Sequence, residues 1–163
     1  MSVIFSGPVA VFDEFHVSRE TRTRIETYVD LLLAWQRRIN LIGPATAGTV
    51  WQRHIADSLQ LLPLLPAGTR TIAELGSGAG IPGLVLAIAA GLEAHLYESN
   101  GKKAAFLREA ARQTGTRAVV HMVRLETLPN AVALPTVQCV VARALAPLPL
   151  LLDYAEPFLS RGA

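Results

Sequence analysis

The chain has 163 residues, of which 51% are hydrophobic and 17% charged, so one domain with a buried core is expected and a mainly disordered chain is excluded. No apolar run reaches the roughly 18–20 residues that cross a membrane. The N-terminal region contains Asp13 and Glu14 and lacks the basic start and apolar core of an export signal, so no such signal is expected. The one cysteine, Cys139, excludes an internal disulfide and a cysteine-based zinc site. We therefore expect a cytoplasmic protein without a metal and without membrane attachment.

The net charge of +2 is spread evenly along the sequence. Residues 1–70 hold seven Arg against six acidic residues, and residues 71–163 hold eight Lys and Arg against seven. Composition alone therefore gives only a weak indication of nucleic-acid binding.

The first part of the chain reads as helical. A short helix is expected near Val9–Phe15, and Ser18 is a good N-cap for an amphipathic helix that runs to about Ile39. After a connector with two glycines and a proline, a second helix is predicted over about Thr49–Leu62. We assign residues 1–68 to an N-terminal helical extension packed on the core.

From Thr71 onward, short strands alternate with helices. Strands are predicted at 71–75, 95–98, 118–122 and 137–141, and helices at 82–90, 102–113 and after Pro147. This alternation predicts an α/β fold whose parallel sheet is covered on both faces. Residues 69–163 form the predicted core domain, and because open sheets of this kind normally continue, we expect its C-terminal strands to be missing.

A glycine-rich loop, Glu74–Gly83, lies between the first predicted strand and the helix after it. Glycines allow a tight turn and let a ligand approach the backbone closely. Gly78-x-Gly80-x-x-Gly83 satisfies the dinucleotide fingerprint. The series starts earlier, however, at Gly76, and Glu74 stands two residues before it. That arrangement is typical of Rossmann-like S-adenosylmethionine-dependent methyltransferases, because a carboxylate suits a cationic amino-acid end and sits poorly against a pyrophosphate.

Glu98 ends the second predicted strand, 22 residues after Gly76. A carboxylate at that position can accept hydrogen bonds from both ribose hydroxyls of an adenosine. NAD would use the same contact, so Glu98 indicates a nucleoside without choosing between the two cofactors. An exposed acid at a strand end is the alternative.

Four stretches of the sequence carry a resemblance to a known family: Trp35–Leu41, Arg53–Leu59, Gly76–Gly83 and Val141–Ala144. The chain resembles the bacterial 16S ribosomal RNA (guanine-N7) methyltransferase family, also called glucose-inhibited division protein B. The resemblance covers roughly residues 28–147. It implies a Rossmann-like S-adenosylmethionine-dependent methyltransferase fold.

The resemblance also implies a cofactor site. It places Gly76, Ile81, Leu125, Glu126 and Arg143 in that site, to which the loop argument adds the residues Glu74, Gly78, Gly80 and Glu98. The family usually has aspartate where this chain has Glu74, and Asp-Ser-x-Gly-Lys-Arg where it has 98–103. Both changes keep the charge.

Polar residues cluster in the second predicted helix. His54 and Ser58 are four residues apart, as are Arg53 and Asp57, so two neighbouring ridges are polar. We predict that they contact the RNA phosphates or the target base, with His54 as a candidate catalytic residue; polar groups on a helix surface are the alternative. Asn40 is assigned in the same way, either to the crevice and the RNA or to the C-cap of the preceding helix.

Arg143 follows the fourth predicted strand, at the edge of the sheet where ligands bind. Its guanidinium could hold the cofactor carboxylate or brace the O6/N7 edge of a guanine, so Arg143 is the other catalytic candidate. Guanine N7 carries a lone pair and no proton, so no general base is needed. Cys139 lies inside an apolar strand and is interpreted as a buried structural thiol.

The sequence thus predicts methyl transfer from S-adenosylmethionine to guanine N7 of 16S ribosomal RNA, free or in the small ribosomal subunit, by a monomeric enzyme. Two alternatives stay open. An NAD(P)-dependent oxidoreductase is disfavoured because no Tyr-x-x-x-Lys pair is present, and a catalytically inactive cofactor-binding or RNA-binding module would fit a shortened C-terminus.

Overall fold

The computed structural model describes residues 7–130 and 133–160 and contains a parallel sheet with the strand order β3-β2-β1-β4. The strands are β1 (Thr71–Leu75), β2 (Glu93–Tyr97), β3 (Ala118–His121) and β4 (Cys139–Ala142). The chain passes from β1 to β2 on one side and later returns to pair β4 with the other edge of β1. The strand order therefore switches direction at β1, which is where open α/β sheets bind ligands.

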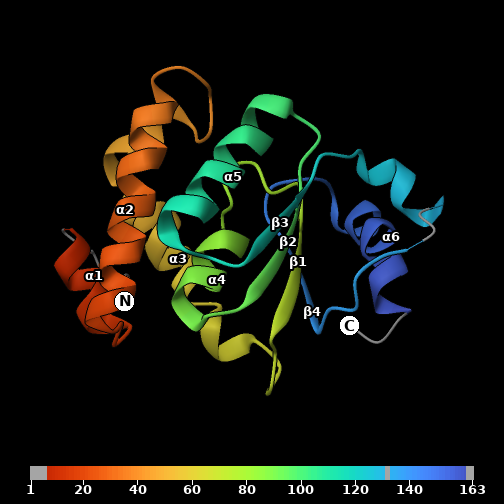
Figure 1. Ribbon diagram of the computed structural model, residues 1–163, viewed down its shortest axis with the longest axis horizontal. Coiled ribbons are helices and arrows are strands. Elements are labelled where there is room, and N and C mark those ends of the chain that lie inside the picture. Colours follow the sequence, from red (N-terminus) through yellow and green to blue (C-terminus); the bar gives the residue numbers. More distant parts are fainter. Residues whose placement is uncertain (1–6, 131–132, 161–163) are drawn as a thin grey trace.

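Helices cover both faces of the sheet (Figure 1). On one face lie α4 (Gly83–Ala90) and α5 (Gly101–Thr114), each ended by a glycine with a positive φ angle. On the other face lie α6 (Leu148–Leu159) and the 3₁₀-helix η4 (Leu125–Asn130). The α/β prediction is confirmed, and β1 agrees residue by residue. The sequence did not predict η4.

The N-terminal helices extend the layer formed by α4 and α5. They are α1 (Pro8–Glu14) and α2 (Arg19–Gln36), and the Ser18 side chain accepts a hydrogen bond from the Thr21 N–H, as a helix N-cap does. Residues of α1, α2, α4 and α5 share one hydrophobic core. The division of the chain after residue 68 stays a prediction.

Helix α2 ends at Gln36, so the C-cap assignment of Asn40 is wrong. The cap is Arg37, and Asn40 is exposed in the loop that follows. The Gln36 side chain holds that loop, because its Oε1 accepts from the Leu41 and Ile42 N–H groups at 2.8 and 3.0 Å.

The α-helix predicted over Thr49–Leu62 is corrected. A 3₁₀-helix, η1 (Pro44–Thr49), leads into a π-helical segment, η2 (Trp51–Ala56), one α-turn, α3 (Asp57–Leu59), and a further 3₁₀ turn, η3 (Leu62–Leu64). A hydrophobic period read over so few residues does not distinguish a 3.6-residue turn from a wider one. The wider turn changes which side chains face inward, and π-helical segments are frequent at functional sites.

One hydrogen bond joins α2 to the glycine-rich loop. The fully buried Tyr28 hydroxyl donates to the Ala79 carbonyl at 2.7 Å. Burial, followed by the charge of Glu74, raises the pKa of Tyr28, so the hydroxyl keeps its proton for this bond.

Replacing this hydroxyl gives a stability test of the link. We expect Tyr28→Phe to lower the free energy of unfolding by about 1–2 kcal/mol, because a buried carbonyl loses its donor while the ring keeps its packing. Thr27→Val is the control, because it removes an exposed hydroxyl of the same helix and should change stability by less than about 0.5 kcal/mol. Equal urea midpoints for Tyr28→Phe and the wild type would contradict the role of this bond.

Candidate functional site

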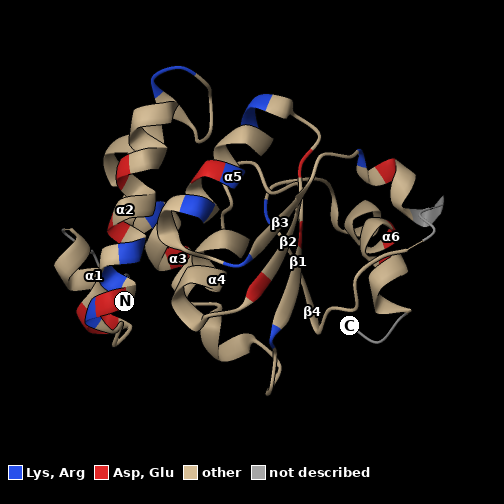
Figure 2. Ribbon diagram, in the orientation of Figure 1, with Lys and Arg blue, Asp and Glu red and all other residues tan. Residues whose placement is uncertain are grey.

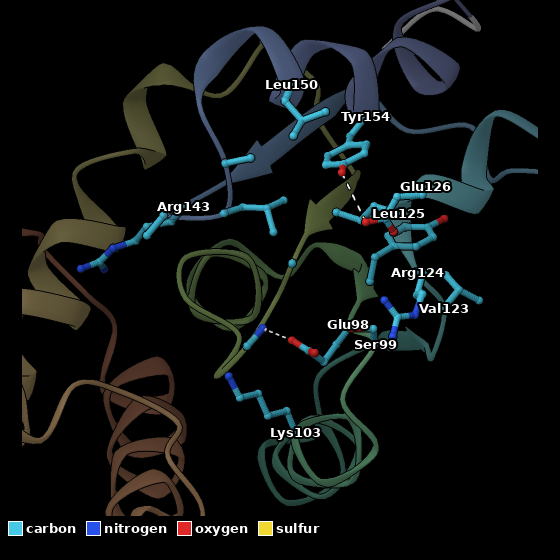
Figure 3. Close-up of a pocket in the computed structure, with 16 residues that line it drawn as sticks. Glu98, Ser99, Lys103, Val123, Arg124, Leu125, Glu126, Arg143, Leu150 and Tyr154 are labelled. Carbon is cyan, nitrogen blue, oxygen red and sulfur yellow. Dashed lines mark hydrogen bonds between the residues drawn. The ribbon is translucent and has the colours of Figure 1, made fainter.

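A cavity of about 400 Å³ opens at the carboxyl ends of β1 and β2 (Figure 3). Its size lies in the range of small-molecule sites. The glycine-rich loop and Glu98 form one wall, η4 forms the opposite wall, and the start of α6 closes the top. The principal lining residues are Gly76, Gly78, Tyr97, Glu98, Lys103, Arg124, Leu125, Glu126, Arg143, Leu145 and Tyr154.

Two glycines bring the loop backbone to the cavity. Gly76 and Gly78 have φ angles of 67° and 54°, which favour glycine. A Cβ atom built on Gly76 would lie 2.5 Å from a methyl carbon of Leu145. A side chain at position 76 would therefore both strain the turn and push Leu145 away from the cavity.

Glu98 fixes the loop to the end of β2. One carboxylate oxygen accepts from the Gly78 N–H at 2.8 Å and the other from the Asn100 N–H at 2.7 Å. The residue is 9% exposed and lines the cavity, so the prediction of a solvent-exposed acid is excluded. Each oxygen keeps a further lone pair, and the carboxylate can still accept from hydroxyl groups of a ligand.

Glu74 is not among the residues that line this cavity, and its assignment as a cofactor contact stays a prediction. It is 1% exposed, and its Oε1 accepts from the Gly83 N–H at 2.6 Å beneath the loop. A Cβ atom at position 83 would lie 2.7 Å from this carboxyl group. The side chain points inward because the loop passes over it and the first turn of α4 offers a free N–H.

Gly80 is likewise absent from the cavity wall. Gly80 has a φ of 81°, and a Cβ atom there would come within 2.7 Å of Leu84 and 3.0 Å of Leu107. Gly80 therefore allows close packing of the loop on α4 and α5, and its assignment as a cofactor contact stays a prediction.

The opposite wall contains the predicted pair Leu125 and Glu126. Glu126 accepts a hydrogen bond of 3.4 Å from the Tyr154 hydroxyl of α6 (Figure 3).

Sequence reasoning missed Tyr97, whose ring stacks on His121 with centroids 4.4 Å apart. Burial raises the pKa of Tyr97 to about 12, and no described residue pairs with its hydroxyl, so a polar atom is left without a partner beside the cavity.

A second cavity of about 280 Å³ adjoins the first and shares Gly76, Gly78, Lys103, Arg143 and Ala144 with it. Its other lining residues are Leu41, Ile42, His54, Ser77, Ala79 and Ile81. The predicted residues Ile81 and His54 therefore lie in this second cavity. Asn40 lines neither cavity, although the next two residues of its loop do line the second one.

Arg143 stands between the two cavities, and its side chain points away from Glu98 and Leu125 (Figure 3). Its Nη2 donates to the Arg53 carbonyl at 3.0 Å and lies 3.8 Å from the Asp57 carboxylate. Its Nη1 is buried without a partner among the described residues. Arg143 lines both cavities, and its guanidinium thus keeps one buried donor group without a partner among the described residues.

His54 and Ser58 are buried, not surface polar groups. Ser58 is 0% exposed and its hydroxyl donates to the His54 carbonyl at 2.6 Å, and its assignment as an RNA contact stays a prediction. His54 lies in η2 and Ser58 in α3, the α-turn that follows it. Arg53 and Asp57 are exposed beside Arg143, and their RNA contact stays a prediction.

The hydrogen-bond network assigns the tautomer of His54. The Thr46 hydroxyl lies 2.8 Å from both the Gly43 carbonyl and His54 Nε2, and it satisfies both contacts when it donates to the carbonyl and accepts from a protonated Nε2. Burial, and then the charge of Arg143, lowers the pKa of His54. A neutral ring therefore leaves Nδ1, which has no partner among the described residues, as a hydrogen-bond acceptor.

Known proteins match nearly the whole chain. The family model described as rRNA small subunit methyltransferase G matches residues 21–163. The chain belongs to this family. A ribosomal RNA small subunit methyltransferase G from Rhodospirillum rubrum is 54% identical, over 96% of this chain and 76% of the relative. Its counterpart from Paramagnetospirillum magneticum is 49% identical, over 96% of this chain and 74% of the relative.

Membership confirms the family resemblance and agrees with the Rossmann-like methyltransferase fold seen in the sheet. A methyltransferase family requires a methyl donor, and the oxidoreductase alternative is set aside.

No helix among the described residues is long and apolar enough to span a membrane. Cys139, predicted as a buried structural thiol, is half-buried in β4 and packs against the core.

The fold gathers positive charge that is spread along the sequence. Figure 2 shows Lys and Arg at the ends of α2 and α5 nearest the cavities. Lys103, Arg124 and Arg143 line the larger cavity, and Arg37, Arg38 and Lys102 line a neighbouring groove. Counting charges along the sequence missed this cluster because its members come from four separate segments.

The buried Glu74 gives a pH test of the loop. Burial raises its pKa from 4.5 to about 8 although the Gly83 N–H opposes the shift. The folded protein keeps a proton that the unfolded chain loses, so the free energy of unfolding should fall as the pH rises from about 5 to about 8 and then level off.

We expect Glu74→Gln, which keeps an acceptor for the Gly83 N–H, to remove this part of the pH dependence. Urea unfolding between about pH 5 and pH 9 measures it. Glu26→Gln, at an exposed position, should keep the wild-type slope. If Glu74→Gln also keeps that slope, the buried carboxyl is not the titrating group.

Proposed function

We propose that this chain transfers a methyl group from S-adenosylmethionine to N7 of a guanine in 16S ribosomal RNA. The observation that carries the proposal is a pair of adjoining cavities that share Gly76, Gly78 and Arg143. Two reactants bound in such cavities meet at a common wall, as a group transfer requires. Family membership gives the reaction class.

The residues of the larger cavity fit the methyl donor. The exposed backbone at Gly76 and Gly78 permits close approach, Glu98 offers acceptors for ribose hydroxyls, and Leu125 with Glu126 borders a space suited to adenine. The unpartnered Tyr97 hydroxyl adds a polar contact. When bound, S-adenosylmethionine supplies an electrophilic methyl group. Glu74 acts from beneath by holding the loop through Gly83, and Gly80 acts through packing.

The smaller cavity offers complementary groups for guanine. Arg143 has a free donor and the neutral His54 a free acceptor. Guanine presents the O6 and N7 acceptors on one edge, and a donor placed on O6 leaves the N7 lone pair free to react. No proton has to leave N7, so these residues orient the base and need no general base among them. Positioning of this kind is worth about 7–11 kcal/mol in favourable cases.

The basic end of the molecule supports an RNA substrate, because cations provide most of the nonspecific affinity for phosphates. We propose that Arg53, Asp57 and the loop at Asn40 lie along the path of the RNA, and that the enzyme acts as a monomer. The sequence leads us to expect a cytoplasmic enzyme, and the cytoplasm is where ribosomal RNA is found. Free RNA and the small ribosomal subunit are both to be tested as substrates.

The first test combines binding and transfer. The wild type should bind S-adenosylmethionine in a calorimetric titration and transfer tritium from the labelled cofactor to 16S ribosomal RNA. We expect Glu98→Gln to weaken cofactor binding roughly tenfold or more, because the charged acceptor and one loop anchor are weakened together. Glu26→Gln should bind as the wild type does.

Two results separate the alternatives. Cofactor binding without label transfer to either substrate would leave an inactive cofactor-binding module. Transfer to a position other than guanine N7, identified by nucleoside mass spectrometry, would refute the proposed target atom.

Arg143 gives a second test, aimed at the smaller cavity. We expect Arg143→Lys to lower kcat at least roughly tenfold while the cofactor Kd changes less than about threefold, since a lysine cannot bond the Arg53 carbonyl and the base together. An equal loss of cofactor affinity would instead place Arg143 on the cofactor.

A further inference from the structure

We propose that a groove between α2 and α5 binds an unpaired nucleotide of the RNA next to the target base. This inference rests on the proposed function and names a second contact surface for its substrate. The groove has a volume of about 540 Å³ and lies outside both cavities described above. Its floor includes Leu31, Trp35 and Ile39, and its rim carries Arg37, Arg38 and Lys102.

The floor of the groove suits a flat, apolar ligand. Trp35 is only partly buried, and its ring packs edge-on against Phe106 with centroids 5.7 Å apart at 62°. Phe106 itself is fully buried and holds that ring in place. An indole whose orientation is already fixed loses little freedom when a base stacks on it, and such stacking tolerates any base.

The rim of the groove suits an anion. The side chains of Arg37, Arg38 and Lys102 are exposed, and none makes an ion pair or hydrogen bond with another described residue. No carboxylate stands among the described residues that line the groove. Three free cations around an aromatic floor match a nucleotide, which joins a planar base to a phosphate.

Residues next to the groove in the sequence take part in the proposed site. Lys102 precedes Lys103, which lines both cavities. On the other side, Gln36 follows Trp35 and holds the backbone of Ile42, which lines the second cavity. We place the groove on the path of an RNA strand whose target base lies in that cavity, and Figure 2 shows basic residues along this end of α2 and α5.

The proposal can be tested with a short RNA and the fluorescence of Trp35. The chain has two tryptophans, so a Trp51→Phe background leaves Trp35 as the only one. Titration with single-stranded hexaadenylate should quench this fluorescence to saturation. In a parallel anisotropy assay with labelled hexaadenylate, Trp35→Leu should weaken binding roughly tenfold, the scale of one lost base stack.

Surface variants keep the test independent of folding. Arg38→Gln and Lys102→Gln alter exposed side chains, and each should weaken the binding of hexaadenylate. Each should also reduce the slope of log Kd against log salt concentration by about 0.7. Arg70→Gln, at the opposite end of β1, removes the same charge and should bind within about twofold of the wild type. Cofactor affinity should be unchanged in all of them.

The outcomes separate this inference from the proposed function. If the enzyme methylates 16S ribosomal RNA but Trp35→Leu, Arg38→Gln and Lys102→Gln bind hexaadenylate like the wild type, the groove is not an RNA site. If hexaadenylate leaves Trp35 fluorescence unchanged while an acidic amphipathic peptide quenches it, the groove docks a protein and the inference is overturned. Failure of methyl transfer with the binding results intact would instead refute the proposed function.

Discussion

Hydrogen bonds from three separate parts of the chain hold the backbone of the glycine-rich loop. The Glu98 carboxylate binds the Gly78 N–H, the buried Glu74 binds the Gly83 N–H, and the Tyr28 hydroxyl binds the Ala79 carbonyl. Glycines alone would leave this turn flexible, because they lose the most conformational freedom on folding. The anchors fix its shape before any ligand arrives, and they make α2 part of the support of the site.

The two cavities depend on this fixed loop because it forms their common wall. The chemistry that the family performs needs accurate placement of two reactants more than it needs acid or base groups. The neutral His54 agrees with this, since burial holds it uncharged with one acceptor free. Arg143 provides the matching donor. The polar groups of the second cavity are thus suited to orienting a base.

Local patterns were enough to predict the sheet and most helices. β1 agrees with the strand predicted at 71–75, and the helix predicted at 102–113 lies within α5. The directions of side chains did not follow. Glu74 turns under the loop and Ser58 packs in the core, because packing between distant segments decides both. The positive charge around the site also comes from separate segments, so only the fold reveals it.

The claim that the anchored loop receives the methyl donor can be tested on the loop backbone itself. In amide NMR spectra of the labelled protein, S-adenosylmethionine should shift the Gly76 and Gly78 signals strongly, while the amide of Gly91, at the far end of α4, stays in place. NAD at the same concentration should shift none of them. If S-adenosylmethionine leaves Gly76 and Gly78 unshifted, or NAD shifts them instead, the loop does not bind this cofactor.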